Sequence, residues 1–125
     1  MESNDMSMDE RLEYCLKQAE TAYTLLNKSR LELFRDSEAV LKLKQELSAK
    51  KAQGLSEGYI SGKNADEREA SAREYMGDVY VELGSAEDEL RHSESDYQFS
   101  LDRVAMQRFH LRVLELLCRN NKDEE

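Results

Sequence analysis

Apolar residues recur every seven positions along the first half of the chain. The row consists of Leu12, Ala19, Leu26, Leu33, Val40 and Leu47. A seven-residue apolar repeat is typical of a helix that packs along one side against another helix. Ser7 followed by Glu10 has the spacing of a capping box, which starts a helix near Met8. The pattern therefore predicts a first long helix over about residues 8–53.

Two companion rows could complete this apolar stripe, and the sequence leaves both open. One row is Leu16, Tyr23, Arg30 and Ser37, and the other is Cys15, Ala22, Ser29, Asp36 and Leu43. Each row is apolar at its start and polar in the middle. The predicted helix contact is therefore apolar toward its ends and polar at its centre.

The second half of the chain carries the same kind of repeat. One row runs Met76, Leu83, Leu90, Tyr97, Val104, Leu111 and Cys118, and its companion runs Val79, Ala86, Ser93, Ser100, Gln107 and Leu114. These rows predict a second long helix over about residues 65–119. We expect the tails, residues 1–6 and 120–125, to be flexible.

A glycine-rich stretch over about residues 54–64 separates the two helices. It holds three of the five glycines, and glycine commonly ends helices because it adopts a left-handed backbone. Asn64 followed by Glu67 is a capping-box pattern for the next helix. We therefore expect an all-α fold, a single antiparallel long-helix hairpin resembling a coiled coil. Folding the chain about residue 59 places Ser37 near Leu83, and a register slipped by one turn fits the two rows nearly as well.

Surplus apolar residues indicate contacts with other chains. The segment 101–117 is apolar around most of its helical circumference, and a helix of this kind is buried on several sides. One hairpin has too little interior to provide that burial. We therefore expect the protein to form a homo-oligomeric helical bundle. The predicted interface consists of Leu12, Leu16, Tyr23, Leu101, Phe109, Val113, Leu116 and Leu117.

The composition favours a protein of long helices over a compact globular protein. The 125 residues include no proline, 36% are charged and 7% are aromatic, which suits long helices better than a compact globule. A net charge of −9 repels nucleic acid at long range, so nucleic-acid binding would need a local basic patch. Two cysteines without metal-ligand spacing, a polar start unlike a signal peptide, and no apolar run of membrane-spanning length predict a cytoplasmic protein.

No catalytic or metal-binding pattern is present in the sequence. His92 and His110 lie eighteen residues apart on one predicted helix, or roughly 27 Å, which is too far to share a metal ion. The Gly58 to Lys63 stretch lacks the spacing and the preceding strand of a phosphate-binding loop. We expect no enzymatic activity, no cofactor, no bound metal and no small-molecule substrate.

The run Tyr59-Ile60-Ser61-Gly62-Lys63, followed by Asp66-Glu67, resembles the centre of the UvsY-type recombination mediators and similar small helical accessory proteins of tailed phages. The resemblance implies an oligomer in the host cytoplasm that binds single-stranded DNA and recombination proteins. Where that family has basic residues before the turn, this chain has Gly54 and Ser56. DNA contact would therefore depend on its neighbouring residues, namely Lys50, Lys51, Tyr59, Lys63 and Arg68.

These residues could also have purely structural roles, and the sequence is compatible with other functions. Lys50 and Lys51 could simply complement the dipole at the end of a helix, and Tyr59 could pack over the turn. The whole chain could be a coiled-coil assembly or adaptor protein without nucleic-acid binding. Alternatively, the acidic run between Glu82 and Asp96 could mimic DNA and inhibit a nucleic-acid enzyme.

Overall fold

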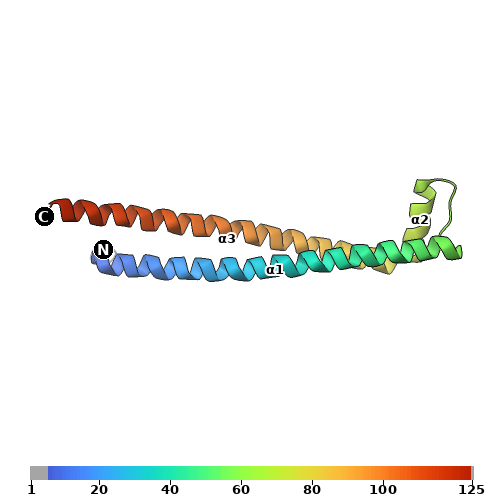
Figure 1. Ribbon diagram of the computed structural model, residues 1–125, viewed down its shortest axis with the longest axis horizontal. Coiled ribbons are helices and arrows are strands. Elements are labelled where there is room, and N and C mark those ends of the chain that lie inside the picture. The colour runs from blue at the N-terminus through green and yellow to red at the C-terminus, as the bar shows by residue number, and fades with distance from the viewer. Residues whose placement is uncertain (1–5, 125) are drawn as a thin grey trace. The chain divides into compact units, whose positions relative to one another are not determined.

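The computed structural model describes residues 6–124, and it describes side chains as far as residue 120. This part of the chain is all-helical and contains no strand. It forms α1 (Met8–Glu57), α2 (Ala65–Tyr75) and α3 (Gly77–Glu124), as Figure 1 shows. The expected start of the first helix agrees with α1. Within the expected C-terminal tail, residues 120–124 continue α3, while the expected N-terminal tail lies almost wholly outside the described residues.

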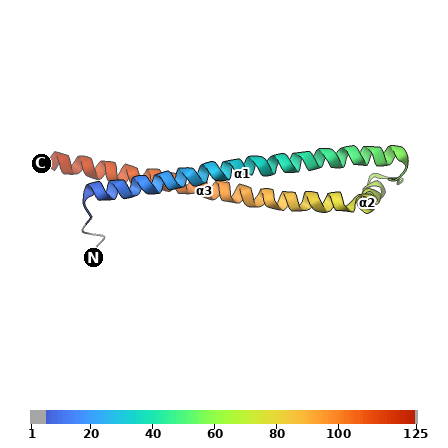
Figure 2. The same cartoon turned by 90° about the horizontal axis from the view of Figure 1, so that it is seen from below.

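The chain divides into two units. Unit 1 comprises Met1–Leu31 and Ser95–Glu125, and unit 2 comprises Glu32–Glu94. Unit 1 therefore contains the beginning of α1 and the end of α3, which are coloured blue and orange to red in Figures 1 and 2. Unit 2 contains the rest of both long helices and the whole of α2. Each unit has its own apolar cluster.

In unit 1, α1 and α3 pack against each other in opposite directions. Ala22, Leu26 and Val104 form a buried cluster, and two partly buried residues, Tyr97 and Leu101, pack against it. Nearer the start of α1, a surface groove joins residues 11–15 to residues 109–114 of α3. Earlier positions of α1 thus meet later positions of α3 within unit 1.

The two predicted rows of the second helix are confirmed as the side of the chain that is covered. Every member of both rows, from Met76 to Cys118, is buried or half-buried. On α1 the structure resolves the choice that the sequence left open. Cys15, Ala22, Ser29, Asp36 and Leu43 are all covered, whereas Leu16, Tyr23, Arg30 and Ser37 are all exposed. The Leu16 side of α1 is therefore left on the surface.

In unit 2, a buried cluster joins the loop, α2 and the start of α3. Ile60, Ala72, Met76 and Val79 form it, and two partly buried residues, Leu47 and Tyr80, pack against it. The Ser93 hydroxyl donates a hydrogen bond to the Asp36 carboxylate. Folding about residue 59 is therefore wrong, because Ser93 and not a residue near Leu83 faces this part of α1. The shift arises because α2 takes up a length of chain before α3 begins.

The first helix is longer than predicted. α1 continues past Gly54 to Glu57, because Gly54 is used for close packing and not as a terminator. A Cβ atom at Gly54 would lie 2.7 Å from Ile60 Cδ1 and 3.3 Å from Tyr75 Cε1. The helix ends instead before Gly58, whose φ of 84° lies in the left-handed region that favours glycine. The expected turn over 54–64 is correspondingly shorter.

The predicted second helix is two helices. Met76 leaves the helical conformation, with φ −131° and ψ 46°, so α2 ends at Tyr75 and α3 begins at Gly77. The Met76 carbonyl accepts hydrogen bonds from the backbone of Val79 at 3.1 Å and of Tyr80 at 3.4 Å, and these begin α3. Met76 itself is buried in the unit 2 cluster, so burial of its side chain accompanies the break.

The predicted start of α2 is confirmed. The Asn64 side chain accepts a 2.9 Å hydrogen bond from the backbone N–H of Glu67, as an N-cap residue does. The Glu67 carboxylate accepts a 2.7 Å hydrogen bond from the backbone N–H of Lys63. None of the helices within residues 6–124 is both long and apolar enough to cross a membrane.

Candidate functional site

Glu69 on α2 is the centre of a charged and aromatic cluster in unit 2. Its carboxylate forms an ion pair with Lys51 of α1 and accepts a 2.9 Å hydrogen bond from the Tyr80 hydroxyl of α3. Arg73, one turn along α2, lies 3.5 Å from the same carboxylate. The Arg73 guanidinium also lies 4.5 Å from the centre of the Tyr80 ring, within the range of a cation–π contact. The cluster thus connects all three helices.

These contacts shift the ionisation of the groups involved. The hydrogen bond from Lys51, followed by that from Tyr80, lowers the pKa of Glu69. The hydrogen bond to Glu69 raises the pKa of Lys51. Burial, followed by the hydrogen bond to Glu69, raises the pKa of Tyr80. All three groups therefore keep their paired forms at neutral pH, which indicates a structural role for the cluster.

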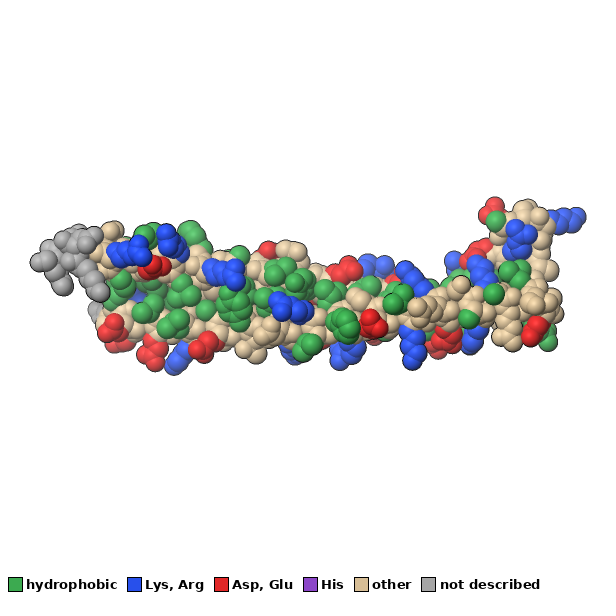
Figure 3. All heavy atoms as spheres, in the orientation of Figure 1, with side chains coloured by type: hydrophobic (Ala, Val, Ile, Leu, Met, Phe, Trp, Pro, Cys, Tyr) green, Lys and Arg blue, Asp and Glu red, His purple; other side chains and the backbone are tan. Residues whose placement is uncertain are grey.

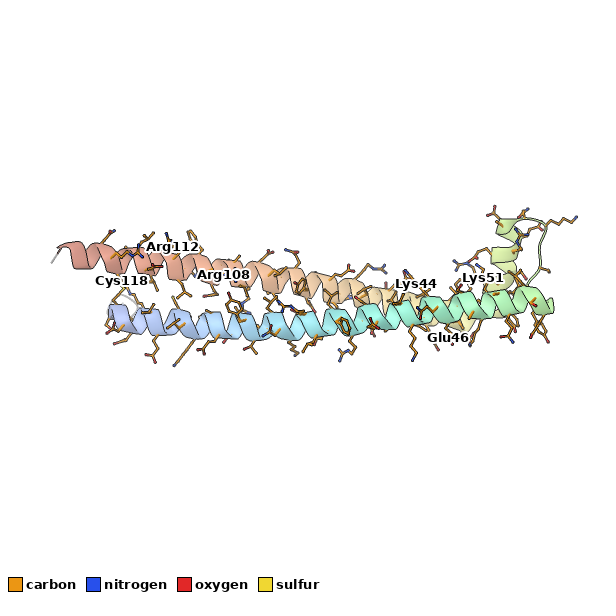
Figure 4. The ribbon with its side chains drawn as sticks, in the orientation of Figure 1. Lys44, Glu46, Lys51, Arg108, Arg112 and Cys118 are labelled. Carbon is orange, nitrogen blue, oxygen red and sulfur yellow. The ribbon has the colours of Figure 1, made fainter. Side chains whose placement is uncertain are left out.

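Two of the predicted DNA-contacting lysines are engaged with carboxylates. Lys51, which is labelled in Figure 4, is held by Glu69. Lys50 lies 3.1 Å from Glu46 one turn earlier on α1, and the hydrogen bond to Glu46 raises the pKa of Lys50. A phosphate group would have to compete with these carboxylates for both ammonium groups.

The other three predicted residues lie in the loop and on α2. Tyr59 stacks on Tyr75, with ring centres 5.3 Å apart and planes only 3° from parallel. Both rings remain substantially exposed, Tyr59 at 61% and Tyr75 at 49%. Within the described residues, neither Lys63 nor Arg68 forms an ion pair. An exposed aromatic pair and two free cations therefore belong to the same short stretch of chain.

The sequence pattern does not single out Glu69 and Tyr80 of the charged cluster, or Tyr75, on which Tyr59 stacks. The spacing of Glu69 and Arg73, four residues apart on one helix, was a signal for their ion pair. No comparable signal connects Lys51 to Glu69 or Tyr59 to Tyr75. Those contacts depend on where α2 ends and on how the loop between α1 and α2 places α2 beside α1.

Unit 1 carries the second candidate site, an apolar surface on α3. We name five exposed residues of α3 the outer stripe: Phe99 (67% exposed), Met106 (57%), Phe109 (65%), Val113 (38%) and Leu116 (44%). From Met106 onward they alternate spacings of three and four, and Phe99 lies seven before Met106. This is the spacing of a coiled-coil contact. Val104 and Leu114 on the opposite side of α3 are buried against α1.

An apolar groove adjoins the outer stripe. Its volume is about 330 Å³, and its lining includes Tyr14 and Cys15 of α1 and Phe109 and Val113 of α3. Figure 3 shows one face of unit 1, at the left of the view, where hydrophobic side chains of both helices gather. Exposed apolar patches on a protein surface commonly mark binding sites for a partner.

The structure divides the predicted interface residues into two groups. Those left exposed are Leu12, Leu16, Tyr23, Phe109, Val113, Leu116 and Leu117. Leu101 differs, because it is half-buried and packs against the unit 1 cluster. Tyr23 also has a local role: its hydroxyl accepts a 2.7 Å hydrogen bond from Arg108 Nε, and the Arg108 guanidinium lies 5.6 Å from its ring. Arg108 is labelled in Figure 4.

Among the described residues, no three His, Cys, Asp or Glu side chains gather closely enough to hold a metal ion. Cys15 and Cys118 are free thiols, each half-buried in unit 1. A scan against protein-family models, a search of curated proteins and a search of solved structures each found no match to this chain.

Proposed function

We propose that the protein is a non-enzymatic helical assembly protein whose unit 1 docks a partner helix on α3. The outer stripe is the observation that carries this proposal. Its residues have coiled-coil spacing, lie opposite the buried side of α3, and include two phenylalanines about two-thirds exposed. Burying such side chains against a partner helix contributes about 1.5–3 kcal/mol each.

The proposal includes an antiparallel hairpin of α1 and α3 in each copy and a cytoplasmic location. The opposite directions of α1 and α3 within unit 1 support the hairpin. The exposed apolar surface of unit 1 supports assembly. A two-helix unit with a small core gains stability when further helices cover its exposed apolar side chains.

The test compares two phenylalanines of almost equal exposure. Phe109→Ser removes a residue of the outer stripe, whereas Phe34→Ser removes an exposed residue of α1 in unit 2 (66% exposed). We expect sedimentation velocity to show a particle heavier than one 14.5 kDa chain for the wild type and for the Phe34 variant. The Phe109 variant should dissociate at concentrations where both remain assembled. A wild type with the mass of one chain at every concentration, or equal behaviour of the two variants, would contradict the proposal.

A second function, single-stranded DNA binding, is favoured by the stacked pair Tyr59–Tyr75. An exposed aromatic ring can stack on a base, and Lys63 and Arg68 supply cations in the same stretch. Fluorescence anisotropy with a labelled oligonucleotide at about 50 mM and about 200 mM salt tests it, because phosphate contacts weaken steeply with salt. Lys63→Glu with Arg68→Glu should abolish binding. Lys42→Glu with Lys44→Glu is the matched control on α1, and equal binding by both variants would exclude this site.

A further inference from the structure

The outer stripe of α3 lies in a basic segment. Residues 101–120 contain four arginines and two carboxylates, Asp102 and Glu115. Arg112 immediately precedes Val113 of the stripe, and Arg119 follows Leu116 by three positions. Arg112 and Arg119 interact only with Glu115 of their own helix among the described residues, at 3.7 Å and 2.8 Å. The guanidinium groups beside the stripe therefore exceed the carboxylates available to them.

The exposed side of α1 in the same unit has the opposite charge. Residues 8–26 contain four carboxylates and two cations. Glu13 lies three positions before Leu16 and Glu20 lies four positions after it, so both share a helical face with this exposed leucine. Within the described part of the chain, neither Glu13 nor Glu20 forms an ion pair. The result is an apolar surface, with Leu12 and Leu16 at its centre, edged by free carboxylates.

These two surfaces complement each other, and we propose that the outer stripe binds the Leu12–Leu16 surface of α1 from a second copy of this chain. This inference rests on the proposed function and names its partner. Glu13 and Glu20 are seven residues apart, as are Arg112 and Arg119, so two ion pairs can form along one helix contact. Leu12 and Leu16 then cover the part of the outer stripe that lies between the two ion pairs.

A second copy of the stripe itself is a poorer occupant. Two outer stripes facing each other would bring together two segments that each carry an excess of arginine, and like charges across an interface oppose binding. The α1 surface removes that repulsion and supplies the missing carboxylates. Charge therefore selects α1 over α3 as the partner helix.

The contact joins different surfaces on the two copies, so a single contact of this kind between two copies is heterologous. Within one unit, α3 packs its buried side against α1, while the outer stripe and the Leu12–Leu16 surface both remain exposed, so the two surfaces are not covered by each other within that unit. Each copy has one stripe and one Leu12–Leu16 surface. It can therefore bind one copy through each, and assembly can continue beyond a dimer.

Charge reversal on each surface tests the pairing. One variant carries Arg112→Glu and Arg119→Glu, and the other carries Glu13→Arg and Glu20→Arg. Each alone should raise the dissociation constant about tenfold or more, because two attractive ion pairs at the rim of the contact become repulsive. An equal mixture of the two variants should reassemble, since every contact in an alternating array is then between opposite charges.

The matched control is Glu87→Arg with Glu94→Arg, which makes the same charge change with the same seven-residue spacing on α3 of unit 2. Sedimentation velocity should show its assembly unchanged, and circular dichroism should show that all the variants keep their helix content. If the mixture fails to reassemble, or the Glu13 and Glu20 variant assembles like the wild type, the inference is wrong. In that case, loss of assembly by Phe109→Ser would still leave the proposed function standing. A single-chain wild type would overturn both.

Discussion

The Tyr80 hydroxyl of α3 donates a 2.9 Å hydrogen bond to Oε1 of Glu69 on α2, across the helix break at Met76. The other carboxylate oxygen of Glu69 receives the Lys51 ammonium group from α1. One carboxylate therefore joins three helices, and its ionisation controls contacts that hold α2 in place. The stability of unit 2 should depend on pH for this reason.

We expect Glu69 to stabilise unit 2 at neutral pH and to stop doing so in acid. Its pKa is lowered in the folded protein, so its contribution is complete above the ordinary value of 4.5. It disappears as the pH falls from that value through the lower folded pKa. Glu69→Gln should therefore lower the melting temperature at neutral pH, and the difference from wild type should vanish at low pH.

Thermal unfolding followed by circular dichroism measures this difference. The control is Glu74→Gln, the same chemical change at an exposed position of the same helix, and Glu74 forms no ion pair within the described residues. A pH-independent effect of Glu69→Gln, or an equal effect of Glu74→Gln, would show that the ionised contact is not what stabilises α2.

Two glycine-to-alanine changes within helices should have opposite effects. Gly84 lies in α3 with open space around it, so Gly84→Ala should stabilise the protein by about 0.5–1 kcal/mol through helix propensity. Gly54→Ala gains the same helix propensity, but it places a Cβ atom 2.9 Å from Cγ1 of the buried Ile60. Overpacking costs about 1–3 kcal/mol, so the net effect should be destabilising. Urea denaturation measures both changes, and stabilisation by Gly54→Ala would mean that the loop can move away freely.

Neighbouring leucines of α1 should differ sharply in their effect on stability. Leu26 is 5% exposed in the unit 1 cluster, whereas Leu25 is 37% exposed. Leu26→Ala should cost about 2–3 kcal/mol, toward the lower end of the range for buried leucines because this core is small. Leu25→Ala should cost well under half as much. Denaturant unfolding at low protein concentration compares them, and equal losses would mean that a second contact covers Leu25.

The polar pair Asp36–Ser93 should weaken the contact between helices relative to an apolar pair. Ser93 is 6% exposed and donates its hydroxyl to the Asp36 carboxylate. Ser93→Ala should destabilise unit 2 by about 1 kcal/mol, because a half-covered carboxylate loses a donor. Asp36→Leu together with Ser93→Ala should instead stabilise it, since Asp36 is the charged member of a row whose residues are all covered. Both variants can be measured by thermal unfolding, and a double change that destabilises would contradict this.

The seven-residue rows predict most of the helical structure, because residues seven positions apart lie on the same face of a helix, and that face packs against the neighbouring helix. Every position from Met76 to Cys118 in the two α3 rows is covered as expected. The rows could not reveal the break at Met76, because Met76 belongs to the apolar row whether or not the helix continues through it. They also could not choose between Leu16 and Cys15 on α1, since both choices are apolar near the start of the helix.

The candidate sites were less predictable for a physical reason. The basic residues near the turn are predicted from the resemblance of the turn and from their charge, and neither shows which lysines already have a partner. Glu69 takes Lys51 only because α2 turns back toward α1. Phe109, Val113 and Leu116 of the outer stripe, in contrast, are predicted as interface residues because the segment 101–117 is apolar around most of its circumference. Phe99 lies outside that segment and is not predicted from it.

The contact between the helices in unit 1 is built largely from small side chains, including Ala19, Ala22, Ser29 and Ser100. In the described part of the chain, no large side chain is completely enclosed. Such a contact lets the backbones approach closely but removes little apolar surface from water. If further copies supply the missing burial, folding and assembly become a single equilibrium, and the midpoint of unfolding rises with protein concentration. The amount of protein present would then determine how much of it is folded.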